Sequence, residues 1–267
     1  MIRLRARRVA LFGGVYSNHL ALGAVLDDAA TAGAEQAVCL GDMGAFGPHP
    51  DRSCEIVRRA GIAVVQGNYD HALGHGLPDC RCGYTDPRDN QYAALSYRYT
   101  FARTDPAHRR WLRDLPTGIR IDLAGREVLL CHGSPRRTNE FLWESACSDA
   151  FLAWLLAESA ADTLCVTHTG LPWTRELPEG GRVVNVGAIG RPANDGDPRV
   201  MYAILTAAED GGAPAVEWRR VAYDHRALAA EMRDEGLPEE FAETIETGWW
   251  TTCLEVLPVK ERCRGRY

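Results

Sequence analysis

Short apolar runs alternate with amphipathic patterns along the first third of the chain. The runs at residues 8–12, 36–40 and 62–66 have the length of buried strands. Two patterns with apolar residues three and four positions apart lie between these runs, and each predicts a helix. This β-α-β-α-β order predicts parallel strands that are joined by crossover helices.

Both predicted helices have start and stop signals. Ser17 or Asn18 can cap the first helix, and Gly33 is expected to end it. Asp51 can cap the second helix, which is short and is followed by Gly61. The signals therefore limit both helices to the space between two strands.

The rest of the chain continues this mixture of elements. Residues 77–115 are expected to form a loop or lid with one or two helices. Further strands are expected at residues 120–123, 127–130, 163–166, 182–184, 200–205 and 216–221. Helices are expected at residues 149–160, after a cap at Asp224, and from Pro238 onward. Without a convincing linker or repeat, residues 1–267 are predicted to be a single α/β domain with an irregular tail at 250–267.

Composition narrows the class of protein. The chain has 267 residues with 46% hydrophobic content, which is enough for one large core or two small ones. Its net charge of −6 argues against general binding to nucleic acid or to an anionic membrane. We see neither a signal sequence nor an apolar run of about 18 to 20 residues that could cross a membrane. We therefore expect a cytoplasmic protein.

The cysteines fit the same expectation. Nine cysteines are scattered along the chain, an odd number without the spacing of a disulfide framework. Cys80 and Cys82 could form a redox or metal pair, but two thiolates do not complete a zinc site. We expect them to be free or loosely structural thiols.

Four potential metal ligands each follow a predicted strand. They are Asp42, Asn68, His132 and His168. In open α/β sheets, ligands gather at the carboxyl ends of the strands. A carboxylate oxygen, an amide oxygen and two imidazoles suit one divalent transition metal such as Mn²⁺, Fe²⁺ or Zn²⁺. The pattern favours a metal site over four unrelated turn and core residues.

The motifs around these residues resemble those of a known family. They are Gly41-Asp42 with Phe46-Gly47-Pro48, Gly67-Asn68-Tyr69-Asp70, His132-Gly133-Ser134-Pro135, and Asn185-Val186-Gly187 with Gly190 and Pro192. From about residue 9 to 249, the chain resembles the calcineurin-like metallophosphoesterases, in their small bacterial phosphodiesterase branch. The resemblance implies a four-layer α/β-β/α sandwich with a two-metal site at one edge.

The resemblance also shows which metal ligands are missing. It implies that Asp42 bridges two metals, and that the other three candidates complete the shell of the second metal. The positions for the first metal's own ligands hold Gly14, Tyr16 and Gly170. We therefore expect a mononuclear centre, and a second metal is doubtful.

Two further positions concern catalysis. Tyr69 stands where many relatives have a histidine that protonates the leaving group, and Asp70 stands where its orienting partner would be. A tyrosine is a weak general acid, but it can donate a hydrogen bond to a developing oxyanion. Arg191 can clamp a phosphate through its fork of donors, or it can lie solvated in its loop.

Other side chains could replace the missing ligands. Tyr16 could bind a ferric ion, and His19, His71 and His75 lie close in sequence to the ligand motifs. Each of these side chains could instead lie at the surface or contact a metal ligand without binding the metal itself. These four are candidates for a second metal.

These observations lead to one main function and two alternatives. We expect a metal-dependent hydrolase that acts on a phosphoester in a small phosphorylated molecule or nucleotide. The chain could instead be an inactive binding or regulatory protein of the same fold, or carry out other metal chemistry. A homo-oligomer is compatible with the sequence.

Overall fold

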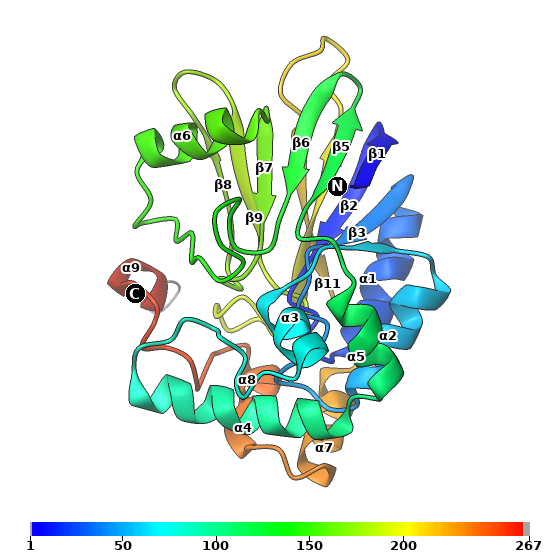
Figure 1. Cartoon of the computed structure of the whole chain (residues 1–267), viewed down its shortest axis with the longest axis vertical. Coiled ribbons are helices and arrows are strands. Elements are labelled where there is room, and N and C mark those ends of the chain that lie inside the picture. The colour runs from blue at the N-terminus through cyan, green and yellow to red at the C-terminus, as the bar shows by residue number, and fades with distance from the viewer. Residues whose placement is uncertain (1, 264–267) are drawn as a thin grey trace.

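Two β-sheets form the centre of the molecule (Figure 1). A computed structural model describes residues 2–263. The six-stranded sheet has the order β1 (Ile2–Ala6), β5 (Ile119–Leu123), β6 (Arg126–Leu130), β7 (Thr163–Val166), β9 (Arg182–Val186) and β8 (Pro172–Glu176). The five-stranded sheet has the order β11 (Ala215–Val221), β10 (Val200–Thr206), β2 (Arg8–Phe12), β3 (Gln36–Cys39) and β4 (Ala63–Val64).

The parallel strands are those expected from the alternating pattern. Strands β2, β3 and β4 run parallel, as do β6, β7 and β9. Strand β10 is antiparallel to both β2 and β11, and β5 and β6 form the expected hairpin. In each sheet, the carboxyl ends of these parallel strands therefore lie at one edge of that sheet.

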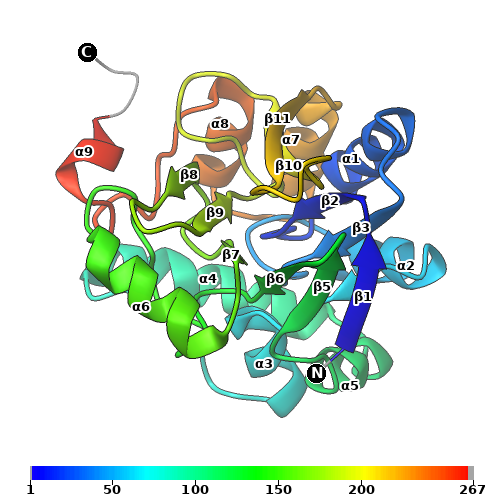
Figure 2. The ribbon, with the colours of Figure 1, turned by 90° about the horizontal axis from the view of Figure 1, so that it is seen from above.

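The helices cover both sheets and one edge of the sandwich. They are α1 (His19–Thr31), α2 (Pro50–Arg59), α3 (Asn68–His75), α4 (Pro87–Arg103), α5 (Pro106–Arg113), α6 (Asp149–Ser159), α7 (His225–Asp234), α8 (Glu239–Thr247) and α9 (Val259–Arg262). Helix α6 lies beside the six-stranded sheet, and α1, α2 and α7 lie beside the other (Figure 2). Helix α4 passes across the edge at which β6 and β7 end. Among the described residues, none of the helices has both the length and the apolar character to cross a membrane.

Alternation along the strands explains the four layers. In β2, Val9 and Leu11 belong to the core between the sheets, whereas Phe12 faces the helices on the outer side. In β6, Leu130 points between the sheets and Leu129 packs in the cluster under α6. Side chains on a strand alternate between its two faces, so each sheet is apolar on both. The expected α/β-β/α sandwich is thus confirmed.

Several boundaries differ from the sequence prediction. Helix α2 begins at Pro50 with His49 as its cap, and Asp51 lies in the first turn rather than at the cap. Proline at the first helical position needs no hydrogen-bond partner for its nitrogen, which favours this earlier start. The third predicted strand is shortened to β4, and β1 and β8 were not expected at all.

The tail at residues 250–267 is not simply irregular. Within its described part, α9 forms at Val259–Arg262, and Trp250 is buried with its indole nitrogen donating to the Pro192 carbonyl (2.7 Å). The Val256 backbone donates to Asp89 on α4 (2.9 Å). These contacts hold the tail across the end of the sandwich. They join segments far apart in sequence, so no local pattern revealed them.

Candidate metal centre

The four potential ligands meet at the edge between the two sheets. Asp42 follows β3, and Asn68 begins α3 shortly after β4, so both come from the five-stranded sheet. His132 and His168 follow β6 and β7 of the six-stranded sheet. All four are buried. The carboxyl ends of parallel strands in both sheets thus bring these side chains together.

Three of these side chains lie within ligand distance of a common point. Asp42 Oδ2 is 3.2 Å from His132 Nε2, which is 3.2 Å from His168 Nδ1. One ligand atom from each residue lies within 4.8 Å of the other two. Such spacing matches donors arranged around one metal ion.

Hydrogen bonds behind the two histidines fix which ring nitrogen faces the centre. His132 Nδ1 donates to the Leu40 carbonyl (2.7 Å), and His168 Nε2 donates to the Cys82 carbonyl (3.2 Å). Because a carbonyl only accepts, each of these nitrogens carries the proton. The opposite nitrogens, His132 Nε2 and His168 Nδ1, are left to bind a metal.

Asn68 adds an oxygen that the structure leaves without a partner. Its amide nitrogen donates to the Cys80 carbonyl (2.9 Å). Its Oδ1 is buried and has no hydrogen-bond partner within residues 2–263. A buried polar atom normally has a partner, so this oxygen is consistent with a role as a metal ligand. The donor set of two oxygens and two imidazole nitrogens fits a borderline divalent ion.

The pKa values of the histidines reflect the same packing. Burial, with His132 beside it, lowers the pKa of His168 to about 3. Burial is the largest influence on the pKa of His132 and lowers it, but the Asp42 carboxylate, the hydrogen bond to Leu40 and the charge of Asp70 together raise it, so the net shift is upward. His168 is therefore neutral at physiological pH, and its Nδ1 lone pair is available to an ion.

Asp70 holds the loops that carry the ligands. Its carboxylate accepts hydrogen bonds from the backbone of Asp42 (2.8 Å), Met43 (2.9 Å) and Gly67 (2.8 Å). Asp42 has a φ of 58°, a backbone conformation that needs such support. Asp70 therefore positions Asp42, and these contacts do not join it to the Tyr69 hydroxyl.

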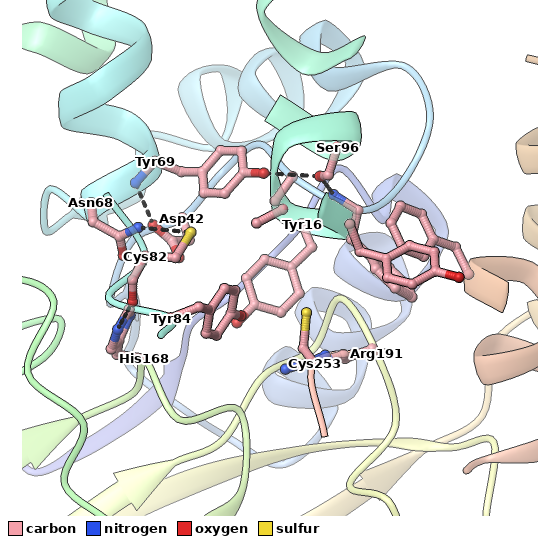
Figure 3. Close-up of a pocket in the computed structure, with 15 residues that line it drawn as sticks. Tyr16, Asp42, Asn68, Tyr69, Cys82, Tyr84, Ser96, His168, Arg191 and Cys253 are labelled. Atoms are coloured by element: carbon pink, nitrogen blue, oxygen red, sulfur yellow. Dashed lines mark hydrogen bonds between the residues drawn. The ribbon is translucent and has the colours of Figure 1, made fainter. Parts of the chain in front are cut away.

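Tyr69 makes a hydrogen bond to Ser96, a contact that the sequence did not predict. Its hydroxyl donates to Ser96 Oγ on α4 (2.9 Å), and its backbone nitrogen donates to Asp42 Oδ1 (3.0 Å) (Figure 3). Burial raises the pKa of Tyr69 far above its usual range. This tyrosine remains protonated near neutral pH, and its high pKa makes it a poor general acid, but its hydroxyl can donate a hydrogen bond.

Large side chains fill the place that the resemblance assigns to the first metal. A β-carbon on Gly14 would lie 2.9 Å from Tyr16 Cζ, so the tyrosine ring covers this glycine. A β-carbon on Gly170 would lie 3.2 Å from the Trp250 ring and 3.4 Å from Arg191 Nη2. The two glycines thus leave room for Tyr16 and for an arginine stacked on a tryptophan.

Arg191 is buried in this arrangement. Its exposed fraction is 6%, and its Cζ lies 3.3 Å from the centre of the Trp250 ring and 5.8 Å from that of Tyr16. Its Nε has no hydrogen-bond partner within the described residues. The solvated alternative for Arg191 is therefore wrong. The interaction with two aromatic faces stabilises the buried charge.

A pocket of about 50 Å³ connects the two halves of the site. Its walls include Tyr16, Asp42, Asn68, Tyr69, Cys82, Tyr84, Ser96, His168, Arg191 and Cys253, and the aromatic residues Phe46, Tyr92 and Phe241 (Figure 3). This volume accommodates a few water molecules. Metal ligands line one side, and aromatic rings line much of the other.

Three of the proposed substitute ligands lie outside this wall. His19 lies 3.6 Å from Glu231 and also contacts Arg52. His71 and His75 pack against each other on α3, with ring centres 4.3 Å apart. Tyr16 is the member of the group that lines the pocket.

Other residues at the site were not anticipated. Ser96, Tyr84, Trp250 and Cys253 come from α4, the loop before it, and the tail. The paired tryptophans at 249 and 250 were a sequence signal that a buried contact lay in the tail.

The expectation of free thiols at positions 80 and 82 is wrong. Cys80 and Cys82 form a disulfide, with their Cα atoms 5.3 Å apart. Arg81 between them has a φ of 49°, which turns the chain tightly enough to bring the two side chains together. Spacing alone did not reveal this turn.

Comparisons with known proteins agree with this geometry. Residues 8–210 match the model of the calcineurin-like phosphoesterase superfamily domain. The chain belongs to this superfamily. Its ligand motifs are therefore those of a metallophosphoesterase fold, whose members are typically metal-dependent.

Individual relatives extend the similarity beyond the matched domain. An uncharacterised protein of Methanocaldococcus jannaschii is 25% identical over 257 residues, covering 90% of this chain and 98% of the relative. The crystal structure of a metallophosphoesterase from Sphaerobacter thermophilus has a TM-score of 0.70 and 28% identity, covering 91% of this chain and 99% of that one. A hypothetical protein from Pyrococcus horikoshii has a TM-score of 0.75 and 22% identity at the same coverage. The similarity thus covers more of this chain than the matched domain does.

Proposed function

We propose that this protein is a phosphoester hydrolase with one metal ion and with Arg191 in the place of a second. The convergence of Asp42, His132 and His168 on one buried point supports this most directly. Asn68, whose buried Oδ1 has no partner among the described residues, lines the same pocket as Asp42 and His168. A divalent ion held there would act as a Lewis acid on a phosphoryl oxygen and would activate water. Mn²⁺, Fe²⁺ and Zn²⁺ all suit the donors.

Arg191 would supply the second positive charge. Its guanidinium remains charged at any physiological pH, and the Trp250 ring fixes its plane. A planar fork of N–H donors matches two oxygens of a phosphate. Because Arg191 lines the same pocket as Asp42 and His168, we propose that it binds the phosphoryl group and stabilises the charge that develops there.

The remaining wall would select the rest of the substrate. Aromatic side chains of Phe46, Tyr84, Tyr92 and Phe241 line the same pocket as the ligands. Such a wall favours a small phosphorylated molecule with a flat or apolar group, including a nucleotide derivative. We propose that the Tyr69 hydroxyl exchanges its hydrogen bond to Ser96 for one to a developing oxyanion. Tyr69 would then keep the role of hydrogen-bond donor that the sequence predicts.

A binding function without turnover is the second candidate. It is favoured by the Tyr69 hydroxyl, which is already bonded to Ser96, and by a tyrosine in the place of an acid. In that case the pocket would hold a phosphorylated ligand between Arg191 and the metal. Thermal stabilisation by such a ligand, with no product formed, would favour this candidate.

Elemental analysis and an ester panel test the proposal together. Purified protein loaded with Mn²⁺, Fe²⁺ or Zn²⁺ should contain one ion per chain and should hydrolyse phosphoesters with aromatic groups. Two ions per chain would contradict the replacement of one metal by Arg191. If the protein contains one ion per chain but shows no hydrolysis that is lost in His132→Ala, the hydrolase proposal fails and the binding function is favoured instead.

A further inference from the structure

The loop formed by Cys80, Arg81 and Cys82 holds two of the four metal-facing side chains from behind. Asn68 Nδ2 donates to the Cys80 carbonyl (2.9 Å), and His168 Nε2 donates to the Cys82 carbonyl (3.2 Å). These bonds leave Asn68 Oδ1 and His168 Nδ1 for the metal. One three-residue loop therefore orients a donor from each sheet of the sandwich.

The disulfide keeps this loop in an unusual conformation. Arg81 has a φ of 49°, in the left-handed region that a non-glycine residue rarely adopts. Asn139 Nδ2 donates to the Arg81 carbonyl (2.9 Å), so a side chain binds each of the three carbonyls. Without the bond between Cys80 and Cys82, the free chain would favour other backbone conformations. The disulfide thus maintains the position of both carbonyls that orient ligands.

This disulfide does not belong to a structural framework. Free thiols are found at Cys39, Cys54, Cys131, Cys147, Cys165 and Cys253. A bond between residues two apart closes a minimal loop, so it restricts the unfolded chain much less than a long-range disulfide. Its main effect is therefore local, on the loop behind the metal ligands.

We propose that the Cys80–Cys82 disulfide is a redox-active site that controls the metal affinity of the centre. This inference rests on the metal centre of the proposed function. In the oxidised loop, both carbonyls orient their ligands and the ion binds tightly. In the reduced loop, Arg81 relaxes, the hydrogen bonds to Asn68 and His168 are lost, and the ion binds weakly.

The redox step is a thiol–disulfide exchange. A small-molecule thiolate attacks one sulfur of the pair and forms a mixed disulfide, and a second thiol displaces the protein sulfur. The protein gains two electrons and two protons and becomes a dithiol, while two molecules of the thiol become one disulfide. Asp79, Arg81 and Gly83 are exposed, whereas Cys80 and Cys82 are 4% and 9% exposed. A local opening of this surface loop is enough to admit the reductant.

Metal titration of the full chain in two redox states tests the inference. One sample remains oxidised, and the other is reduced with an excess of dithiol that is then removed without air. Differential alkylation and peptide mass spectrometry establish the state of Cys80 and Cys82. We expect Mn²⁺, titrated against a fluorescent chelator, to bind about 10- to 100-fold more weakly to the reduced protein, as when other residues that orient a ligand are lost.

Cysteine variants separate loop opening from other effects of the reductant. The Cys80→Ser/Cys82→Ser double variant should bind Mn²⁺ as weakly as the reduced protein, with or without reductant. Cys147→Ser removes a free, partly exposed thiol outside the pocket and should behave like the unmodified protein. Circular dichroism of each variant checks that the fold is intact.

Three outcomes would overturn the redox inference and leave the proposed function untouched. The first is equal Mn²⁺ affinity in the oxidised and reduced states. The second is a pair of free thiols at 80 and 82 in protein purified in air. The third is tighter binding after reduction, with a thiolate-to-metal absorption band for Co²⁺, which would make Cys82 a ligand. If the oxidised protein binds no ion at all, both the inference and the metal centre of the proposed function fail.

Discussion

The two halves of the pocket differ in what fills them. On one side, Asp42, His132 and His168 present donor atoms to one point, and the nearby pocket residue Asn68 has an Oδ1 that lacks a partner among the described residues. On the other side, aromatic rings and the Arg191 guanidinium occupy the space above Gly14 and Gly170. One half is arranged to receive a cation, and the other already contains one.

This difference suggests how a two-metal site can lose one metal without losing its charge. A metal needs several donor side chains, whereas an arginine needs only room and a surface on which to stack. Under the proposed function, the glycines at the two positions where the resemblance implies ligands would provide the room, and Trp250 the surface. On the proposed function, such an exchange would preserve a positive potential at the phosphoryl group but would remove a site for activating water.

The largest expected effect on metal affinity and hydrolysis comes from a substitution in the half of the pocket that contains the candidate metal ligands. His132→Ala removes a donor and leaves Asp42 without its partner, so the ion should be lost. We expect metal affinity to fall by more than the roughly 100-fold upper value for residues that only orient a ligand, and hydrolysis to fall to background. Elemental analysis and an ester assay measure both.

His71→Ala is the matched control for that variant, because His71 lies on α3 outside the pocket wall. It should retain both the ion and the activity. An unchanged ion content in His132→Ala would show that the metal lies elsewhere.

The second effect concerns the half filled by Arg191. Arg191→Ala should lower kcat/KM by about 10²- to 10³-fold, the range for the loss of one preorganised donor, and the ion content should not change. Arg191→Lys retains the charge but loses the planar fork, so it should recover only part of the activity. A loss of the ion in either variant would mean that Arg191 supports the ligands, and the contrast between the halves would then fail.

The third effect measures how tightly the arginine half is packed. Gly170→Ala places a methyl group against Trp250 and Arg191 at a φ of +74°. We expect the free energy of unfolding to fall by about 2 to 4 kcal/mol from backbone strain and overpacking together. Denaturant titration provides the value.

Gly33→Ala separates the two causes. Gly33 also has a φ of +74°, but no atom lies within 4 Å of the added methyl group. Gly33→Ala should therefore report the backbone strain alone, and its free energy of unfolding should fall by less than that of Gly170→Ala. Equal losses in the two variants would indicate that the space above Gly170 is loosely packed.

The smallest effect is the pH dependence of the loop that carries Arg191. Hydrogen bonds from Arg199 lower the pKa of Asp197 to about 2. Because this pKa is lower in the folded state, the stabilisation is present above the unfolded value of about 4 and is lost as the pH falls toward 2. Asp197→Asn should lower Tm by at most a few degrees at neutral pH, and the difference should shrink as the pH falls toward 2 and vanish below it. A difference that persists there would point to a cause other than this charge.

Much of the fold could be predicted because its signals are local. Residues 163–166 form a strand with the expected bounds, and Asn18 and Asp224 cap the expected helices. The period of the apolar residues decides between strand and helix, and capping depends on the next few residues. The edge strand β1 carries this period in its alternating sequence IRLRA but was not predicted, whereas β8 has only its first two residues buried and lacks a clear alternation.

The sequence by itself determined which four side chains are candidate donors, because each follows a parallel strand whose end must lie at the same edge of its sheet. It also placed Gly14, Tyr16 and Gly170 where the family resemblance implies ligands of a first metal. Only the tertiary structure decided that Arg191 stacks on Trp250, that Asp70 supports Asp42, and that the disulfide loop supports Asn68 and His168. These contacts join side chains from distant segments, and their energies depend on packing and burial rather than on any period along the chain.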